Sequence, residues 1–174
     1  MCRPVFPRVH TLLCDSLVWL TRLYLSDGSI AAAIESLPNV HGGIGGLGAM
    51  AATAALTTCI QALPYKLTGY CGVMLPVCED QRLSAIPGDK TARKYSIAHL
   101  MNVSSVCGVG VDTVPLAAST PPEAIAGLIL DVAALGARWN KPLSVRVFPV
   151  AEKEAGEMTT FDSPFLCNTK VFEL

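Results

Sequence analysis

The sequence predicts an α/β fold, and two observations support this. The clearest helical pattern, residues 120–139, leads into an alternating strand pattern at 143–148 across a link of three residues. Helices that lead directly into strands are typical of α/β proteins. Hydrophobic residues make up 51% of the chain and charged residues only 16%, where a typical domain carries about 25% charged residues. A sheet covered by helices on both faces would bury such an apolar chain.

Two helices are predicted near the N-terminus, at residues 12–25 and 30–37. Ser26-Asp27-Gly28 separates them with residues that favour turns. Ser29 is a residue type that caps helix N-termini, so the second helix is expected to begin directly after it.

A glycine-rich loop at residues 41–48 then leads into a helix of small residues at about 49–62. No Lys, Arg, Asp or Glu occurs between residues 36 and 65, which is long enough for a membrane span. The stretch consists of Gly, Ala and Thr rather than Leu and Phe, and prolines interrupt it. It therefore predicts a helix packed against protein, and no membrane association is expected.

Four segments follow in the middle of the chain. Residues 72–77 predict a short buried strand, and the polar residues 79–94 predict an exposed loop around Pro87-Gly88-Asp89. Residues 95–106 predict a helix or a passage from helix to strand, and the valine-rich residues 108–116 predict another strand or a loop.

The last helix has the strongest pattern. Thr120 and Glu123 have the spacing of a capping box, and Pro121 occupies the expected first helical position. Asn140 follows as a stop signal. Apolar residues recur between these signals at helical spacing: Ile125, Leu128, Ile129, Val132, Leu135 and Trp139.

Charge and cysteine content exclude several classes of protein. The net charge is −1 and no basic stripe is present, so nucleic acid is not an expected partner. The seven cysteines are odd in number and never form a C-x-x-C pair, which argues against a disulfide framework and a zinc site. The protein is therefore expected in a reducing, cytoplasmic compartment. The cysteines are Cys2, Cys14, Cys59, Cys71, Cys78, Cys107 and Cys167.

Four segments, in order, resemble the DUF711 (UPF0210) family. They are Gly-Tyr-Cys-Gly-Val-Met-Leu-Pro-Val at 69–77, Val-Cys-Gly-Val-Gly-Val-Asp-Thr-Val-Pro-Leu at 106–116, Asn-Lys-Pro-Leu-Ser-Val-Arg at 140–146, and the terminus at 155–171. Members of this family are substantially longer. The resemblance therefore implies that residues 1–174 form a single α/β unit like the C-terminal half of such a protein.

The resemblance also implies a larger architecture. The family is similar in fold to the pyruvate formate-lyase-like (PFL-like) glycyl radical enzymes, an α/β barrel with helices packed outside the strands. The resemblance implies no particular reaction, and the cofactor stays unassigned. The resemblance also predicts that the chain forms a homo-oligomer or associates with the missing N-terminal portion, because either arrangement would cover its apolar surface.

Three residues are candidates for catalysis. Cys107 is a possible nucleophile, because Gly108 and Gly110 would let the backbone approach a ligand and offer amide donors to an oxyanion. Asp112 stands among valines, where an acid must be paired, hydrogen-bonded or shifted in pKa. Cys71 is predicted to face Cys107 across a sheet. The alternative is that both cysteines only pack in the core and that Asp112 holds a loop.

The glycine-rich loop is the candidate ligand-binding segment. Gly43, Gly45 and Gly48 satisfy G-x-G-x-x-G before a helix, with His41 beside them. A phosphate or a substrate carboxylate would suit such a loop. A dinucleotide site also needs a preceding strand and an acid about 20 residues further on, whereas the next acid here is Glu79. A tight structural turn is the alternative.

The leading functional hypothesis is an enzyme that acts on a small polar metabolite. Cys107, Asp112 and the loop at residues 41–48 would surround its pocket at one end of a barrel. One alternative is a metabolite-binding or regulatory protein without covalent chemistry. Another is a structural subunit of a larger assembly. No metal site is predicted.

Overall fold

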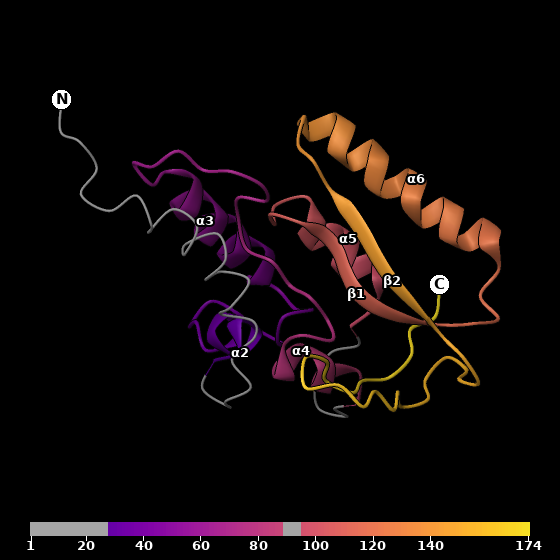
Figure 1. Ribbon diagram of the computed structural model, residues 1–174. Coiled ribbons are helices and arrows are strands. Elements are labelled where there is room, and N and C mark those ends of the chain that lie inside the picture. The colour runs from indigo at the N-terminus through magenta and orange to yellow at the C-terminus, as the bar shows by residue number, and fades with distance from the viewer. Residues whose placement is uncertain (1–27, 89–94) are drawn as a thin grey trace.

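The computed structural model describes residues 28–88 and 95–174 and shows a mixed α/β arrangement (Figure 1). The predicted α/β class is confirmed, whereas the helix predicted at 12–25 lies outside the described residues. The elements are α2 (Ile30–Glu35), α3 (Ala49–Gln61), α4 (Gln81–Ala85), η1 (Ile86–Gly88), α5 (Ile97–Ser104), β1 (Gly110–Ala117), α6 (Pro122–Trp139) and β2 (Ser144–Val150).

The sheet consists of β1 and β2, which pair in parallel with α6 as the crossover between them. Gly110 pairs with Ser144, and the register shifts at a bulge between Val111 and Val114. Within the bulge, Thr113 has φ +50°, which is unusual for a β-branched residue. The strands predicted at 108–116 and 143–148 are confirmed to within two residues at each end.

The sequence signals predict the C-terminal end of α6 correctly but not the cap at its N-terminal end. Asn140 ends the helix in a left-handed conformation, φ +47°, as its stop signal predicts. The capping box predicted from Thr120 is wrong, because Pro121 is the N-cap and no side chain caps this end. The helix begins one residue later than predicted, so Pro122 takes the first helical position and Thr120 lies outside the helix.

Residues 72–77 are buried but do not form the predicted strand. They run beside β1, where Val77 N–H donates to Asp112 O at 3.0 Å and Val73 O accepts from Gly108 N–H at 2.7 Å. Pro76 has no N–H to donate to a ladder. The segment therefore covers the edge of β1 without becoming a third strand.

The exposed loop predicted at 79–94 is wrong for residues 79–88. This part of the chain contains α4 and η1, and Asp80, Leu83 and Ile86 are at most 2% exposed. Asp80 caps α4 by accepting from the backbone N–H groups of Arg82 and Leu83, both at 2.9 Å. The remainder of the predicted loop, 89–94, lies outside the described residues.

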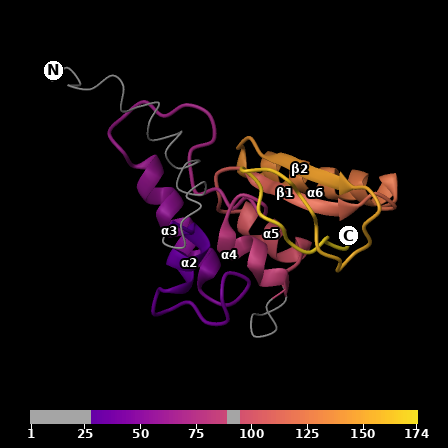
Figure 2. The ribbon, with the colours of Figure 1, turned by 60° about the horizontal axis from the view of Figure 1, so that its bottom comes forward.

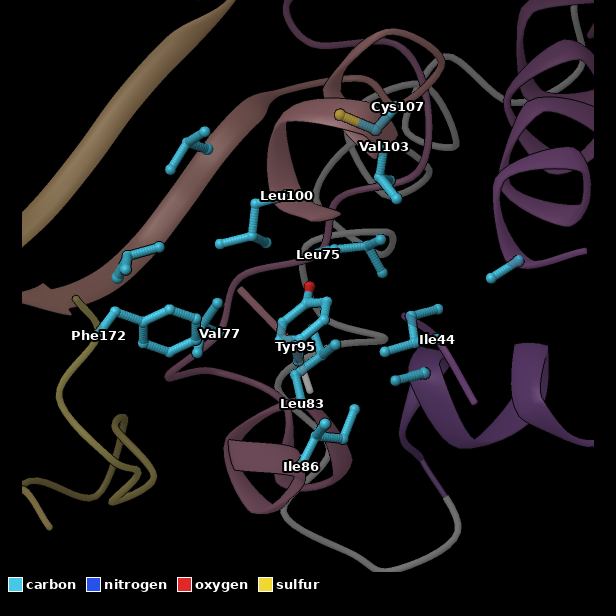
Figure 3. Packing of buried hydrophobic residues seen from close by; sticks show 14 of the residues in the cluster. Ile44, Leu75, Val77, Leu83, Ile86, Tyr95, Leu100, Val103, Cys107 and Phe172 are labelled. Atoms are coloured by element: carbon cyan, nitrogen blue, oxygen red, sulfur yellow. The ribbon is translucent and has the colours of Figure 1, made fainter. Parts of the chain in front are cut away.

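One apolar cluster joins the helices to β1, whose eight residues are all buried. Figure 3 shows the Tyr95 ring within this cluster and Cys107 beside Val103 at one end of it. The tail also contributes, since Phe172 is buried and its N–H donates to Pro115 O at 2.8 Å. The tail therefore packs against β1 through Phe172.

The helices occupy different parts of the molecule. α2 and α3 lie together at one end, and α6 runs along the two strands at the other (Figure 1). Turning the molecule shows the same separation, with α5 lying between the two ends (Figure 2). None of the helices in residues 28–88 and 95–174 combines the length and apolar character that a membrane span needs.

Candidate functional site

A small cavity of about 120 Å³ brings the two candidate cysteines together. Three segments form it: the end of α3 with the turn after it, the turn before β1, and the link between α6 and β2. Its lining residues are Gln61, Gly69, Tyr70, Cys71, Cys107, Gly108, Lys141 and Pro142. Cys71 and Cys107 thus meet at one cavity, although 36 positions separate them in the sequence.

Two glycines make this approach possible. A Cβ atom on Gly108 would lie 2.8 Å from the Cα atom of Gly72, and a Cβ on Gly72 would lie 2.9 Å from the Cα of Gly108. Backbones approach this closely only where both residues lack side chains. Since Gly72 follows Cys71 and Gly108 follows Cys107, the glycine contact holds the two cysteines near each other.

The Cys107 thiol is 2% exposed and interacts with its own loop. The Gly110 N–H donates to Cys107 Sγ at 3.3 Å. The Gly108 N–H is occupied by Val73 O. These two amides were predicted to be free for an oxyanion, and the structure instead engages both of them.

The Cys71 thiol has a different environment. It is half-buried, and its sulfur lies 3.4 Å from Gly69 O and 3.6 Å from Thr68 O. These carbonyl groups accept from a protonated thiol. Gln61 Nε2 donates to the Cys71 carbonyl at 3.0 Å and fixes this segment against α3.

Lys141 supplies the cation of the cavity, and sequence analysis missed it. Its Nζ atom donates to Cys107 O at 2.8 Å and to Ser105 O at 3.3 Å, close to the end of α5. Burial lowers the pKa of Lys141, and the neighbouring Cys107 opposes that shift. The Asn140-Lys141-Pro142 link between α6 and β2 was the available signal.

Asp112 lies elsewhere and does not line this cavity. Its buried carboxylate forms a two-pronged ion pair with Arg146, whose Nη2 donates to Asp112 Oδ2 at 2.9 Å and whose Nε donates to Oδ1. Arg146 also donates to Glu79 Oε1 at 3.2 Å. The hydrogen bonds to Asp112 are the main reason that the pKa of Arg146 is raised. This pair links β1 to β2, whereas the structural alternative given for Asp112 was that it holds a loop.

Removing Arg146 is expected to destabilise the protein more than neutralising Asp112. The Asp112 side chain is 2% exposed and the Arg146 side chain 51%. Arg146→Ala therefore leaves a buried carboxylate without its partner, whereas Asp112→Asn leaves a guanidinium group that water can reach. Because the Arg146 side chain is half-exposed, water screens this ion pair in part. We therefore expect Arg146→Ala to lower the free energy of unfolding by about 1–3 kcal/mol. Urea denaturation of both variants measures this. Equal losses, or a larger loss for Asp112→Asn, would contradict it.

Two other described cysteines, Cys78 and Cys167, have thiol groups whose pKa values are raised. Burial, with help from Cys167, Glu79 and Asp112, raises the pKa of the Cys78 thiol to about 12. Cys78 is therefore protonated at neutral pH and is a poor nucleophile. Burial also raises the pKa of Cys167. Across the described ranges, no group of three His, Cys, Asp or Glu side chains could hold a metal ion.

The glycine-rich loop lies apart from the cavity and folds onto a carboxylate of the chain itself. Ile44 N–H donates to Glu35 Oε1 at 3.0 Å, and a Cβ on Gly43 would lie 2.7 Å from that oxygen. Gly48 is the N-cap of α3, with φ +88°. His41 is exposed, and the ring of His99 lies against Gly45. Binding of an external anion by this loop stays a prediction.

Comparison with known proteins shows the family. The family described as Uncharacterised ACR (DUF711) matches residues 25–163. The chain belongs to the DUF711 family. This span includes the cavity, the ion pair of Asp112 with Arg146, and the glycine-rich loop.

Individual relatives also support the assignment of the chain to the DUF711 family. A UPF0210 protein of Lacticaseibacillus paracasei is 32% identical over 143 residues, which is 79% of this chain and 30% of that protein. A UPF0210 protein of Syntrophobacter fumaroxidans is 32% identical over 157 residues, or 80% of this chain and 34% of the relative. The chain thus spans about a third of the length of these relatives. No solved structure matches.

Proposed function

We propose that this DUF711 protein is an enzyme that acts on a small polar metabolite and that Cys107 is its nucleophile. The observation that carries the proposal is the single cavity that Cys107 shares with Cys71 and Lys141. Its volume is about 120 Å³. A substrate with only a few non-hydrogen atoms would fit.

The proposed chemistry begins at the Cys107 sulfur. Lys141 would accept the thiol proton, since burial lowers its pKa and increases the fraction of neutral amine. The sulfur would then form a bond to an electrophilic carbon of the substrate, while the electron pair of the attacked double bond moves to its outer atom. The Gly110 N–H would stabilise the thiolate. Cys71 is proposed as the second thiol at the site.

The wider setting is part of the same proposal. The chain would form one part of a PFL-like barrel, as the family resemblance implies, with Asp112 holding β1 to β2. A reducing, cytoplasmic location is supported by the five free cysteines of the described residues, Cys59, Cys71, Cys78, Cys107 and Cys167. The cofactor is left open.

Iodoacetamide labelling of the native protein tests the nucleophile. Rates at each cysteine would be followed by peptide mass spectrometry across pH, with and without a pool of small polar metabolites. We expect Cys107 to label faster than the exposed Cys59, despite its burial, and metabolites to slow it. Lys141→Met should lower the Cys107 rate about tenfold, the effect of one favourable charge interaction worth about 1.4 kcal/mol.

Controls separate this result from a structural effect. Lys141→Arg retains a donor to the Cys107 carbonyl and a permanent positive charge beside the sulfur. It should therefore retain both stability and the fast labelling, whereas Lys141→Met loses the fast labelling. A native protein in which Cys59 labels while Cys107 does not would contradict a nucleophilic role.

A binding protein without covalent chemistry is the second candidate. The observation that favours it is the burial of Cys107, together with the engagement of both neighbouring glycine amides. In that case a metabolite should raise the melting temperature in a saturable manner while the Cys107 labelling rate stays low. The same metabolite pool, tested by thermal shift, distinguishes the two functions.

A further inference from the structure

The tail, residues 151–174, contacts the body of the molecule at Cys167 as well as at Phe172. The Cys167 N–H donates to Cys78 O at 2.7 Å. This contact brings two cysteines together across 89 positions of the sequence. Standard bond lengths then place their Cα atoms less than about 7 Å apart, and a disulfide needs Cα atoms within about that distance. The two backbones are therefore close enough for a disulfide.

The sulfur atoms of the two residues are also neighbours. After burial, Cys167 is the largest contributor to the raised pKa of Cys78, ahead of Glu79. Glu79 is the next residue in the chain, so this order is informative. Because electrostatic interactions weaken with distance, it indicates that the Cys167 sulfur lies close to the Cys78 sulfur. The two side chains therefore approach each other, as a disulfide also requires.

The two thiols differ in their access to solvent. Cys78 is fully buried, whereas Cys167 is half-buried. A small oxidant such as hydrogen peroxide can therefore reach Cys167 first. Oxidation of an accessible thiol that lies next to a second thiol commonly ends in a disulfide between the two. The structure thus provides both the point of entry and the thiol that closes the bond.

We propose that Cys78 and Cys167 are a redox modification site, at which peroxide closes a disulfide that fastens the tail to the segment before α4. Peroxide first oxidises the Cys167 thiol to a sulfenic acid and releases one water molecule. The Cys78 sulfur then attacks the Cys167 sulfur and the S–O bond breaks. The hydroxyl group leaves with the Cys78 proton as a second water molecule. Under reducing conditions both residues stay as thiols.

Burial makes the closure of this disulfide slow. The pKa of Cys78 is raised to about 12 and that of Cys167 is raised as well, so little thiolate is present at neutral pH. Proximity opposes this effect, because the fold holds the second thiol beside the first. We therefore expect the disulfide to form over minutes to hours, within the usual range for protein disulfides.

Peptide mass spectrometry under non-reducing conditions tests the proposal on the full chain. The native protein is treated with hydrogen peroxide, then unfolded and alkylated with iodoacetamide. We expect the peptide that contains Cys78 to be joined to the peptide that contains Cys167, and dithiothreitol to separate them. Protein oxidised in urea should give mixed cysteine pairings, because the contact is lost there.

Thermal unfolding before and after oxidation supplies the second measurement. Since the disulfide closes a loop of about 90 residues, it should raise the melting temperature by at least about 5 °C. Cys167→Ser should show neither the cross-link nor the rise. The matched control is Cys59→Ser on α3, which removes an exposed cysteine and should behave like the wild type.

Two results would overturn the proposal. One is a Cys78 thiol that still accepts iodoacetamide when the peroxide-treated native protein is unfolded. The other is a cross-link between Cys78 and Cys167 that forms only in urea. Both are measured at these two cysteines alone, so they are independent of whether Cys107 acts as a nucleophile.

Discussion

Asp80→Ala is expected to lower the free energy of unfolding by about 3–5 kcal/mol, a large part of the stability of a typical domain. The carboxylate is 1% exposed and accepts from two helix N-termini at once. It receives the N–H of Ile30 at 2.9 Å and the hydroxyl of Ser29 at 2.7 Å, and it also caps α4. Alanine would leave several buried donors without partners, each costing about 1–3 kcal/mol before relaxation.

Urea denaturation with a matched aspartate variant measures this effect. Asp131 is exposed on α6, so Asp131→Ala should change stability by no more than about 0.5 kcal/mol. Asp80→Asn retains one acceptor oxygen and should lie between the wild type and Asp80→Ala. If Asp80→Ala and Asp131→Ala cost the same, the double cap would contribute nothing.

Gly108→Ala is expected to destabilise the protein by about 3 kcal/mol, the upper part of the usual range for overpacking. The new Cβ would lie 2.8 Å from both the N and Cα atoms of Gly72. Because these are backbone atoms, no side chain can turn away to make room. The segment containing Cys71 must then move from β1. The labelling rates of Cys71 and Cys107 should change together with stability.

Gly127→Ala supplies a control of opposite sign. Gly127 lies within α6, and a Cβ there would meet no atom within 4 Å. Alanine in a helix is favoured over glycine by about 1 kcal/mol, so this variant should be more stable than the wild type. Thermal unfolding of both variants measures the contrast. A neutral Gly108→Ala would show that the two backbones are not in contact.

The elements that sequence analysis predicted well have signals within a short stretch of chain. The apolar residues of α6 repeat over five turns, and the stop at Asn140 depends on that residue alone. Ser29 caps α2 from the adjacent position, at 3.0 Å to Ala32 N–H. Local chemistry of this kind acts the same way in any fold, so it can be read directly from the sequence.

The errors arose where distant residues determine structure. α4, which the sequence did not predict, has only five residues, too few to show helical periodicity or to be stable alone. Asp80 caps it and also reaches α2 across about 50 positions. The polar composition of residues 79–88 indicated a loop because a buried, shared aspartate cannot be distinguished from an exposed one in the sequence.

The candidate site was predicted in part for the same reason. The structure brings Cys71 and Cys107 together, whereas Asp112 pairs with Arg146 and the glycine-rich loop folds onto Glu35. The glycines after Cys107 suggested a close approach of the backbone to a ligand, whereas the structure brings Gly108 against Gly72. Lys141 was missed because its position at the cavity depends on how α6 returns the chain to β2.

The double cap by Asp80 has a consequence for motion. If α2 separates from α4, the Ser29 hydroxyl and the N–H groups of Ile30 and Ala31 lose their acceptor Asp80 together. We therefore expect the two helices to open as one unit. Their amide protons should therefore exchange with solvent at one common rate, although the two helices are far apart in the chain. Residues 29–35 and 80–85 would behave as one cooperative opening unit, and the loop at 41–48 between them should exchange faster.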